Sequence, residues 1–202
     1  DSAQNPKTTV QMLGLNRMLA FDHDTGVLVT EAGVLLADVI EHFLPRGWFP
    51  AVTPGTRYVT VGGMVAADVH GKNHHIEGGF GNFVEWLEIM TADGLTQRVS
   101  LHQNRELFCD TLGGMGLTGI IIRVAFRLKR VETGWIRQKA ICAPDLATVV
   151  ADFERHADSP YSVAWIDCLA KGKATGRSVL FLGEHAKRDS LPQSIKTDVF
   201  AA

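Results

Sequence analysis

The chain has 202 residues, of which 46% are hydrophobic and 21% charged, and its 20 Lys and Arg nearly balance its 22 Asp and Glu. A formal net charge of −2 supplies no strong positive field, which argues against a nucleic-acid partner. The ordinary apolar content argues against disorder, and no run of about 18 uncharged apolar residues predicts a membrane span.

The first fifty residues predict alternating strands and helices. β-branched and aliphatic residues predict strands at 8–13 and 26–30. Apolar residues at helical spacing predict an amphipathic helix over 35–44, which Pro45-Arg46-Gly47 ends, and a short strand follows at 48–52.

Residues 53–82 differ from the rest, because glycine-, threonine- and histidine-rich segments follow one another with little periodicity. Only residues 64–69 predict a short buried helix. A loop-rich stretch of this length inside a compact domain is usually functional.

Regular patterns return after residue 82. Strands at 83–91 and 96–100 predict a hairpin, and a short helix follows at 105–112. A long strand begins at Ile120, with apolar residues on one face and basic residues on the other, which predicts antiparallel pairing with one wet face. The apolar face comprises Ile120, Ile122, Val124, Phe126 and Leu128, and the basic face comprises Arg123, Arg127 and Lys129.

The pattern of predicted elements changes again after residue 133. The residues predict a strand at 135–142, a helix at 144–156 with proline in its first turn, and strands at 161–169 and 178–182 that a basic turn joins. This β-α-β-β order indicates the start of a second α+β unit. We therefore expect one domain at 1–133 and the beginning of another at 134–202.

The three cysteines, Cys109, Cys142 and Cys168, form neither a CxxC pair nor the framework of a small secreted protein. We expect reduced thiols and a cytoplasmic location, in solution or at a membrane surface. The chain begins with Asp1 and no signal-peptide pattern follows, so we expect that something upstream has been removed or left out.

Residues 114–119 satisfy the GxGxxG pattern of dinucleotide-binding folds. That fingerprint needs a strand before it and a helix after it, and here the predicted order is reversed. The glycines are therefore expected to let a helix turn tightly into a strand. A phosphate-binding P-loop is absent as well, since Asn73 follows Gly71-Lys72.

Three imidazoles, His70, His74 and His75, lie within six positions. Zinc binding with Asp68 or Glu77 is one interpretation, but adjacent histidines in an irregular loop seldom point at one centre, and we expect no metal. Structural polar contacts are a second interpretation. The third is a role beside a bound ligand, favoured because Lys72 brings a positive charge into the same turn.

The segment from Thr53 to Gly63 combines glycines with threonine hydroxyls. Glycine lets a ligand approach the backbone closely, and successive N–H groups can hold a phosphate. Simple loop geometry would explain the same pattern. Its co-occurrence with the histidine-rich loop favours a large anionic ligand.

The ordered run PGT…VTVGG…HGKNHH…GGFGN…TADG…ELF…GGMGLTGII resembles FAD-dependent oxidoreductases of the vanillyl-alcohol-oxidase and p-cresol-methylhydroxylase type, and among them the polyprenyl-sugar oxidase branch. The resemblance implies an α+β fold, with a partial FAD-binding domain followed by the start of an α+β substrate domain. It also implies that His70 and Lys72 face the substrate. Contacts with FAD are implied for Pro54, Gly55, Thr56, Val59, Gly62, Gly63, Ala67, His70, Gly71, Gly119 and Ile121.

The family pattern has two further parts. The first phosphate loop, which in some relatives carries a histidine bonded covalently to the flavin, would lie just before Asp1. The second half of the substrate domain and the final strands, with an expected catalytic lysine, would lie after Ala202, so covalent attachment of the flavin is left open. We expect FAD-dependent oxidation of a CH–OH group of a small-molecule sugar or a lipid-linked sugar. His70 would act as base or hydrogen-bond partner, and Lys72 would stabilise an alkoxide or a phosphate. Alditol or aldonolactone oxidation, and a non-catalytic nucleotide-binding fragment, are the alternatives.

Overall fold

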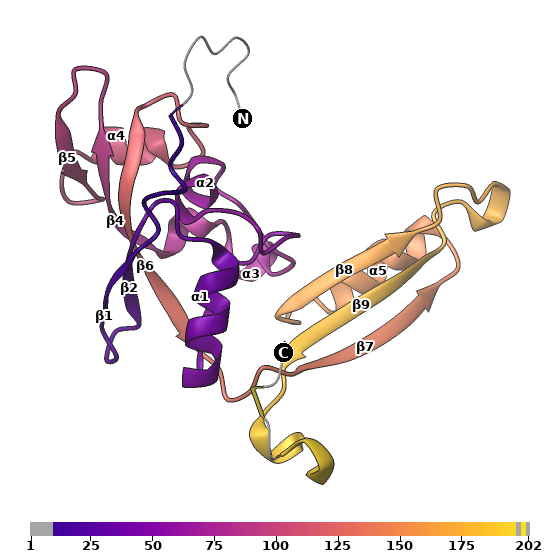
Figure 1. The fold of residues 1–202 in the computed structure, drawn as a ribbon. Coiled ribbons are helices and arrows are strands. Elements are labelled where there is room, and N and C mark those ends of the chain that lie inside the picture. The colour runs from indigo at the N-terminus through magenta and orange to yellow at the C-terminus, as the bar shows by residue number, and fades with distance from the viewer. Residues whose placement is uncertain (1–9, 197–198, 201–202) are drawn as a thin grey trace. The chain divides into compact units, whose positions relative to one another are not determined.

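A computed structural model describes residues 10–196 and 199–200, and they divide into two compact units (Figure 1). Unit 1 holds the chain up to Gly71 and the stretch Gly79–Arg130. Unit 2 holds the short segment Lys72–Gly78 and the chain from Val131 onward. The chain thus passes from unit 1 into unit 2 and back within the histidine-rich loop.

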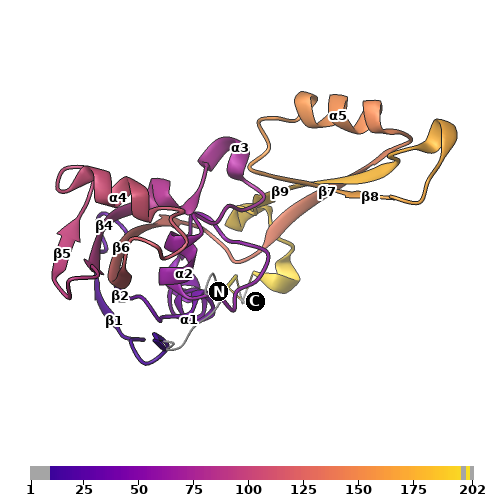
Figure 2. The same cartoon turned by 90° about the horizontal axis from the view of Figure 1, so that it is seen from above.

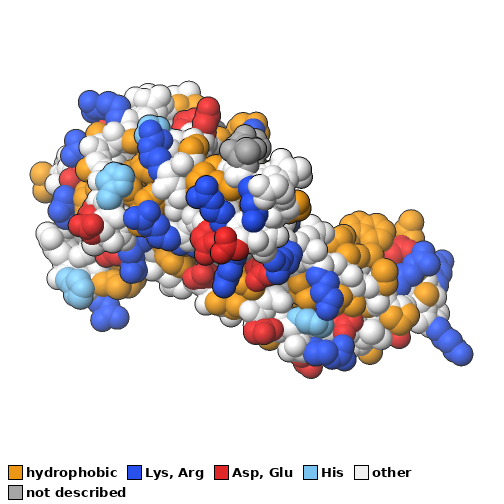
Figure 3. Space-filling view, turned by 90° about the horizontal axis from the view of Figure 1, so that it is seen from below, with side chains coloured by type: hydrophobic (Ala, Val, Ile, Leu, Met, Phe, Trp, Pro, Cys, Tyr) orange, Lys and Arg blue, Asp and Glu red, His pale blue; other side chains and the backbone are white. Residues whose placement is uncertain are grey.

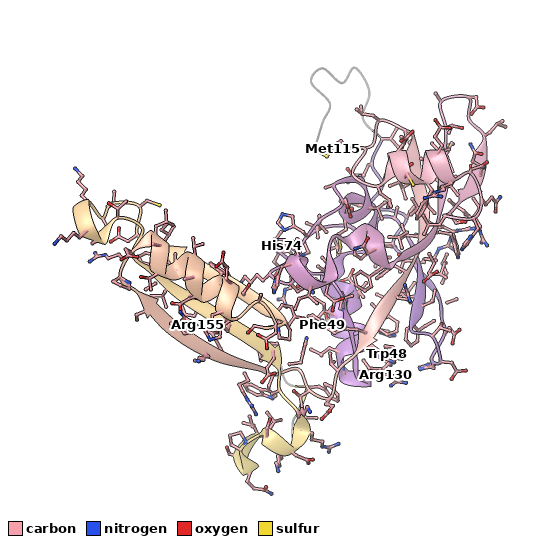
Figure 4. The ribbon with its side chains drawn as sticks, turned by 180° about the vertical axis from the view of Figure 1, so that it is seen from behind. Trp48, Phe49, His74, Met115, Arg130 and Arg155 are labelled. Carbon is pink, nitrogen blue, oxygen red and sulfur yellow. The ribbon has the colours of Figure 1, made fainter. Side chains whose placement is uncertain are left out.

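Unit 1 is built on an antiparallel sheet in the order β1-β2-β6-β4-β5, with β3 paired to the end of β6. The long strand β6 (Ile120–Arg130) is central and pairs with three neighbours, all antiparallel as predicted. The others are β1 (Met18–Phe21), β2 (Val27–Glu31), β3 (Trp48–Pro50), β4 (Val84–Met90) and β5 (Thr96–Val99). Where β3 meets β6, the Arg130 guanidinium lies 3.9 Å from the Trp48 ring centroid (Figure 4).

Helices cover one face of this sheet and close the core of unit 1. The helix α1 (Leu36–Phe43) buries Leu36, Val39 and Phe43, which share one helical face. The short α2 (Val61–Ala66) packs against β2 and β6 (Figure 2) and places Met64 and Val65 in the core. The remaining helical elements are α4 (Arg105–Thr111), η1 (Leu44–Arg46) and η2 (Phe80–Phe83).

The predicted strand at 8–13 is wrong where it can be tested, because residues 8 and 9 lie outside the described residues and 10–13 form no strand. Val10 and Leu13 are exposed, and the Leu15 N–H donates to the Met12 carbonyl in a turn. The first strand of the described residues is β1, which no prediction included.

The predicted helix at 64–69 begins and ends three residues earlier, as α2. The Thr60 hydroxyl caps it by accepting a hydrogen bond from the Gly63 N–H at 3.1 Å. At the other end Asp68 has φ +38°, which is incompatible with a continued helix.

The predicted faces of β6 hold for Val124, Phe126 and Leu128, which are buried, but not for Ile120 and Ile122. The register with β4 shifts between Glu88, opposite Arg123, and Ile89, opposite Ile121. This bulge turns Ile121 into the core instead, at 7% exposure.

Unit 2 contains a three-stranded antiparallel sheet in the order β7-β9-β8, covered on one face by α5 (Leu146–Arg155). The strands are β7 (Ile136–Ala143), β8 (Tyr161–Ile166) and β9 (Ser178–His185), so all the predicted strands of this region exist. The prediction that Pro144 lies in the first turn of α5 is wrong, because Asp145 caps the helix and Pro144 precedes the cap.

Short helical segments complete unit 2. They are α3 (His74–Glu77), η3 (Gly172–Ala174), η4 (Arg188–Ser190) and η5 (Gln193–Ile195). Helices and antiparallel sheets thus make up both units, which confirms the α+β class. Among the described residues, every helix is too short or too polar to cross a bilayer.

Candidate functional site

Most of the residues implied in FAD binding lie in unit 1 on one continuous stretch of backbone, from the coil at 53–60 through α2 to His70 and Gly71. The coil is partly or fully exposed from Thr53 to Thr60. The helix α2 fixes the position of its far end.

The first N–H groups of α2 hold the helix in place. The N–H of Val61 donates to the Val34 carbonyl at 2.8 Å, and that of Gly62 donates to the Ala32 carbonyl at 2.8 Å. The next N–H, of Gly63, donates to the Thr60 cap. A phosphate held by backbone amides would therefore need the amides that precede α2.

Those preceding amides are available. Within residues 10–196 and 199–200, the N–H groups of Thr53, Gly55 and Thr56 donate to no other residue. Gly55 is exposed, and a Cβ placed on it would meet nothing within 4 Å. This coil can present its backbone to a ligand at van der Waals distance.

A permanent cation, Arg57, directly follows these amides in the chain. Arg57 lies 5.4 Å from the Tyr58 ring centroid, and its Nη2 donates to the Tyr58 hydroxyl at 3.4 Å. That hydrogen bond raises the pKa of the Arg57 guanidinium above its usual value. Free amides, a glycine without neighbours and a guanidinium together fit an anionic group such as a pyrophosphate.

The glycines of this region divide into two kinds. A Cβ on Gly62 would lie 2.8 Å from the Ala32 Cβ, and one on Gly119, whose φ is +148°, would lie 2.5 Å from the Met90 carbonyl oxygen. The fold itself requires glycine at both positions. Gly63 and Gly55 are different, because a Cβ on Gly63 would meet only the Thr60 hydroxyl, at 3.0 Å, and Gly55 has open space.

The GxGxxG loop lies against the end of α2. The Gly113 N–H donates to the Val65 carbonyl at 3.0 Å, and the Met115 N–H donates to the Ala66 carbonyl at 2.8 Å (Figure 4 labels Met115). The loop follows α4 and leads into β6, which confirms that the order of the Rossmann fingerprint is reversed. Gly119 and Ile121 lie in the same unit as Ala67, but the Ile121 side chain is buried in the core.

Asp68 is a residue whose role in this region sequence reasoning missed. Its Oδ1 accepts a hydrogen bond from the Gly81 N–H at 2.7 Å, and a Cβ on Gly79 would collide with the carboxylate. The backbone of His70 forms an isolated antiparallel bridge with Gly79. Asp68 and the GGFGN segment therefore fix the backbone on which the exposed His70 is carried; the positive φ of Asp68 is invisible in the sequence.

The two residues expected to face the substrate fall in different units, His70 in unit 1 and Lys72 in unit 2. Lys72 is exposed, and its backbone carbonyl accepts a hydrogen bond from the Ser162 N–H at 3.0 Å. The rings of His74 and His75 lie 5.9 Å apart, and His75 Nε2 is 3.0 Å from the Ser159 carbonyl oxygen. Among the described residues, no three His, Cys, Asp or Glu side chains converge as metal ligands would.

Comparison with known proteins identifies similar chains. A family described as FAD binding domain matches residues 1–100. The chain is 37% identical over 202 residues to decaprenylphosphoryl-beta-D-ribose oxidase of Mycolicibacterium smegmatis, covering 98% of this chain and 44% of that protein. It is 37% identical over 170 residues to an uncharacterized protein in the mprA 5′ region of Streptomyces coelicolor, covering 84% and 46% of the two chains.

L-gulonolactone oxidase of Scyliorhinus torazame is 29% identical over 129 residues, covering 63% of this chain and 29% of that protein. The chain therefore spans less than half the length of the curated relatives it matches here.

Proposed function

Because the chain belongs to the FAD-dependent oxidoreductases of the vanillyl-alcohol-oxidase and p-cresol-methylhydroxylase type, we propose that it oxidises a CH–OH group of a sugar or of a polyprenyl-phosphate-linked sugar. Its cofactor is FAD. Unit 1 would belong to an FAD-binding domain at 1–133, and most of unit 2 to a substrate domain that begins at 134.

One observation carries the proposal: the coil at 53–57 offers free amides, an open glycine and a permanent cation next to α2. Pro54, Gly55 and Thr56 would hold the pyrophosphate. The residues that would lie along the rest of the cofactor are Val59, Gly62, Gly63, Ala67, His70, Gly71, Gly119 and Ile121. When bound, FAD supplies the two-electron chemistry by accepting the carbinol hydrogen together with its electron pair.

The side chains of this chain would handle the proton and the charge. The His70 imidazole would accept the proton of the substrate hydroxyl as a general base. The Lys72 ammonium would stabilise the developing negative charge on the same oxygen, or a phosphate of the substrate. Both side chains are exposed, as groups that meet a substrate must be.

The location proposed for this reaction is the cytoplasm, and a lipid-linked substrate would be met there at a membrane surface. All three cysteines are exposed free thiols, which suits a reducing compartment. No nucleic-acid partner is proposed, given the net charge of −2.

The test is anaerobic stopped-flow reduction of the flavin in the full-length protein. We expect His70→Ala and Lys72→Ala each to slow reduction by roughly 10²–10³-fold. His102→Ala, which removes an exposed imidazole from the turn after β5, is the matched control and should leave the rate unchanged. Wild-type rates in both variants would refute the assigned roles.

The substrate class is decided by comparing donors in the same assay. A polyprenyl-phosphoryl sugar is expected to reduce the flavin fastest. Faster reduction by a free alditol or an aldonolactone would favour the alternative that the similarity to L-gulonolactone oxidase suggests. A colourless protein that takes up no FAD on reconstitution would refute the proposal in favour of a non-catalytic fragment.

A further inference from the structure

Long-range hydrogen bonds fasten the segment Lys72–Gly78 to the rest of unit 2. The Ser162 N–H donates to the Lys72 carbonyl at 3.0 Å, and His75 Nε2 lies 3.0 Å from the Ser159 carbonyl oxygen. Both partners lie at the start of β8 or just before it. The two bonds therefore act on one short stretch of the chain.

The first bond uses the free edge of the sheet. In the order β7-β9-β8, the described residues pair another strand with only one side of β8. The unpaired N–H groups of an edge strand are strong donors that seek an acceptor. The Lys72 carbonyl takes one of them, so the backbone of Lys72 is held by the sheet of unit 2.

The second bond requires the imidazole to donate from Nε2. A carbonyl oxygen can only accept a hydrogen bond, so His75 must carry its proton on Nε2 to make this contact. The helix α3 buries none of its side chains, so polar contacts rather than apolar packing hold it. The His75 side chain therefore helps to hold in place a segment that buries little apolar surface.

We propose that His75 is a positioning residue, which keeps Lys72 in place by fastening the Lys72–Gly78 segment to the start of β8. The inference rests on the proposed function, in which Lys72 meets the substrate. It goes beyond that proposal because it assigns the placement of Lys72 to His75, a residue that the proposed function does not use.

The structural part is tested by amide hydrogen exchange in the full-length protein. In His75→Phe we expect the Ser162 amide to exchange roughly tenfold faster, as suits the loss of about one hydrogen bond. His75→Gln, whose amide can donate to the Ser159 carbonyl, should restore much of the protection. The matched control is His156→Phe, which breaks a comparable bond from an imidazole to the Asp152 carbonyl, at 2.9 Å, elsewhere in unit 2.

The functional part is a double-mutant cycle on flavin reduction. His75→Phe alone should slow reduction roughly tenfold, and His156→Phe should leave it unchanged. If His75 acts through Lys72, then His75→Phe will cause no further loss in the Lys72→Ala background. Losses that multiply in the double variant would overturn the proposal, because His75 would then act by another route.

A measurement without substrate keeps this proposal separate from the proposed function. Acetylation of the Lys72 amine by acetic anhydride, followed by mass spectrometry, should change in rate in His75→Phe but not in His75→Gln or His156→Phe. If no sugar reduces the flavin, altered exchange at Ser162 and altered labelling of Lys72 still support the positioning role. Unchanged exchange at Ser162 in His75→Phe overturns it.

Discussion

Units 1 and 2 bury their side chains in very different ways. In unit 1 a continuous cluster runs from Leu28 to Leu128 and joins the sheet to α1, α2 and α4. The core between α5 and its sheet in unit 2 has four buried residues, Ala143, Val149, Leu180 and Leu182. Apolar side chains also gather on the surface of unit 2 (Figure 3), where Trp165 is 63% and Leu169 88% exposed. The larger buried core of unit 1 therefore allows this unit to lose more stabilising contacts than unit 2 before it unfolds.

The largest effect expected from this difference is the response to a truncated leucine. Leu87 in unit 1 and Leu180 in unit 2 are both fully buried, so Leu→Ala should cost about 2–5 kcal/mol at either site. Unit 1 should remain folded after that loss. We expect Leu180→Ala to unfold unit 2 near room temperature, because the free energy of unfolding that its small core supplies is no larger than the loss.

Calorimetry and residue-resolved hydrogen exchange would measure this. For Leu180→Ala we expect two separate transitions, with unit 1 unfolding at the wild-type temperature. For Leu87→Ala the upper transition alone should move. A single cooperative transition in Leu180→Ala would break the comparison, since it would mean that the two units share one stability.

A smaller effect is expected where a methyl group is added instead. A Cβ on Gly62 in unit 1 would lie 2.8 Å from the Ala32 Cβ and 3.1 Å from the Ala32 carbonyl oxygen. A Cβ on Gly183 in unit 2 would lie 3.3 Å from a methyl group of Ile136, which can move. We expect Gly62→Ala to cost about 1–3 kcal/mol and Gly183→Ala less than about 0.5 kcal/mol. Urea denaturation checks both values, and equal costs would show that unit 2 is packed as tightly as unit 1.

Local patterns in the sequence predict most of the elements of both units. Alternating and helical periodicities locate the core strands and α1, because those residues face a core. They fail at β1, whose Leu19 is exposed, and at Ile120 and Ile122, where a bulge in the pairing with β4 changes which residue faces inward. A bulge is set by the partner strand and leaves no local signal.

The candidate site shows the same limit. The glycine-rich motifs mark the stretch from Thr53 to Gly71, but the sequence cannot separate glycines that the fold needs, such as Gly62, from one with open space, such as Gly55. The hydrogen bond that joins Lys72 to the sheet of unit 2 comes from Ser162, 90 positions away along the chain. Only tertiary structure supplies that contact.

The smallest expected effect compares the helix caps of the two units. Asp145 caps α5 by accepting the Thr148 N–H at 2.8 Å, and this hydrogen bond lowers the pKa of its carboxyl group. Thr60 caps α2 with a hydroxyl that does not titrate in this range. A carboxyl whose pKa falls on folding stabilises fully above its unfolded value of about 3.9, and that contribution is lost as the pH falls through the lowered folded value.

Asp145→Ala should therefore lower the unfolding temperature of unit 2 at pH 7, and the loss should shrink as the pH falls below about 4. Thr60→Ala should lower that of unit 1 by a similar amount at both pH values, since no proton is involved. Asp145→Ser keeps an acceptor without the charge, so it should remove this part of the acid sensitivity of unit 2. Calorimetry at pH 7 and at about pH 3 decides the matter. If Asp145→Ala lowered the unfolding temperature equally at both pH values, the charge of the Asp145 carboxylate would not contribute to the cap. The helix cap of unit 2 would then be no more sensitive to acid than that of unit 1.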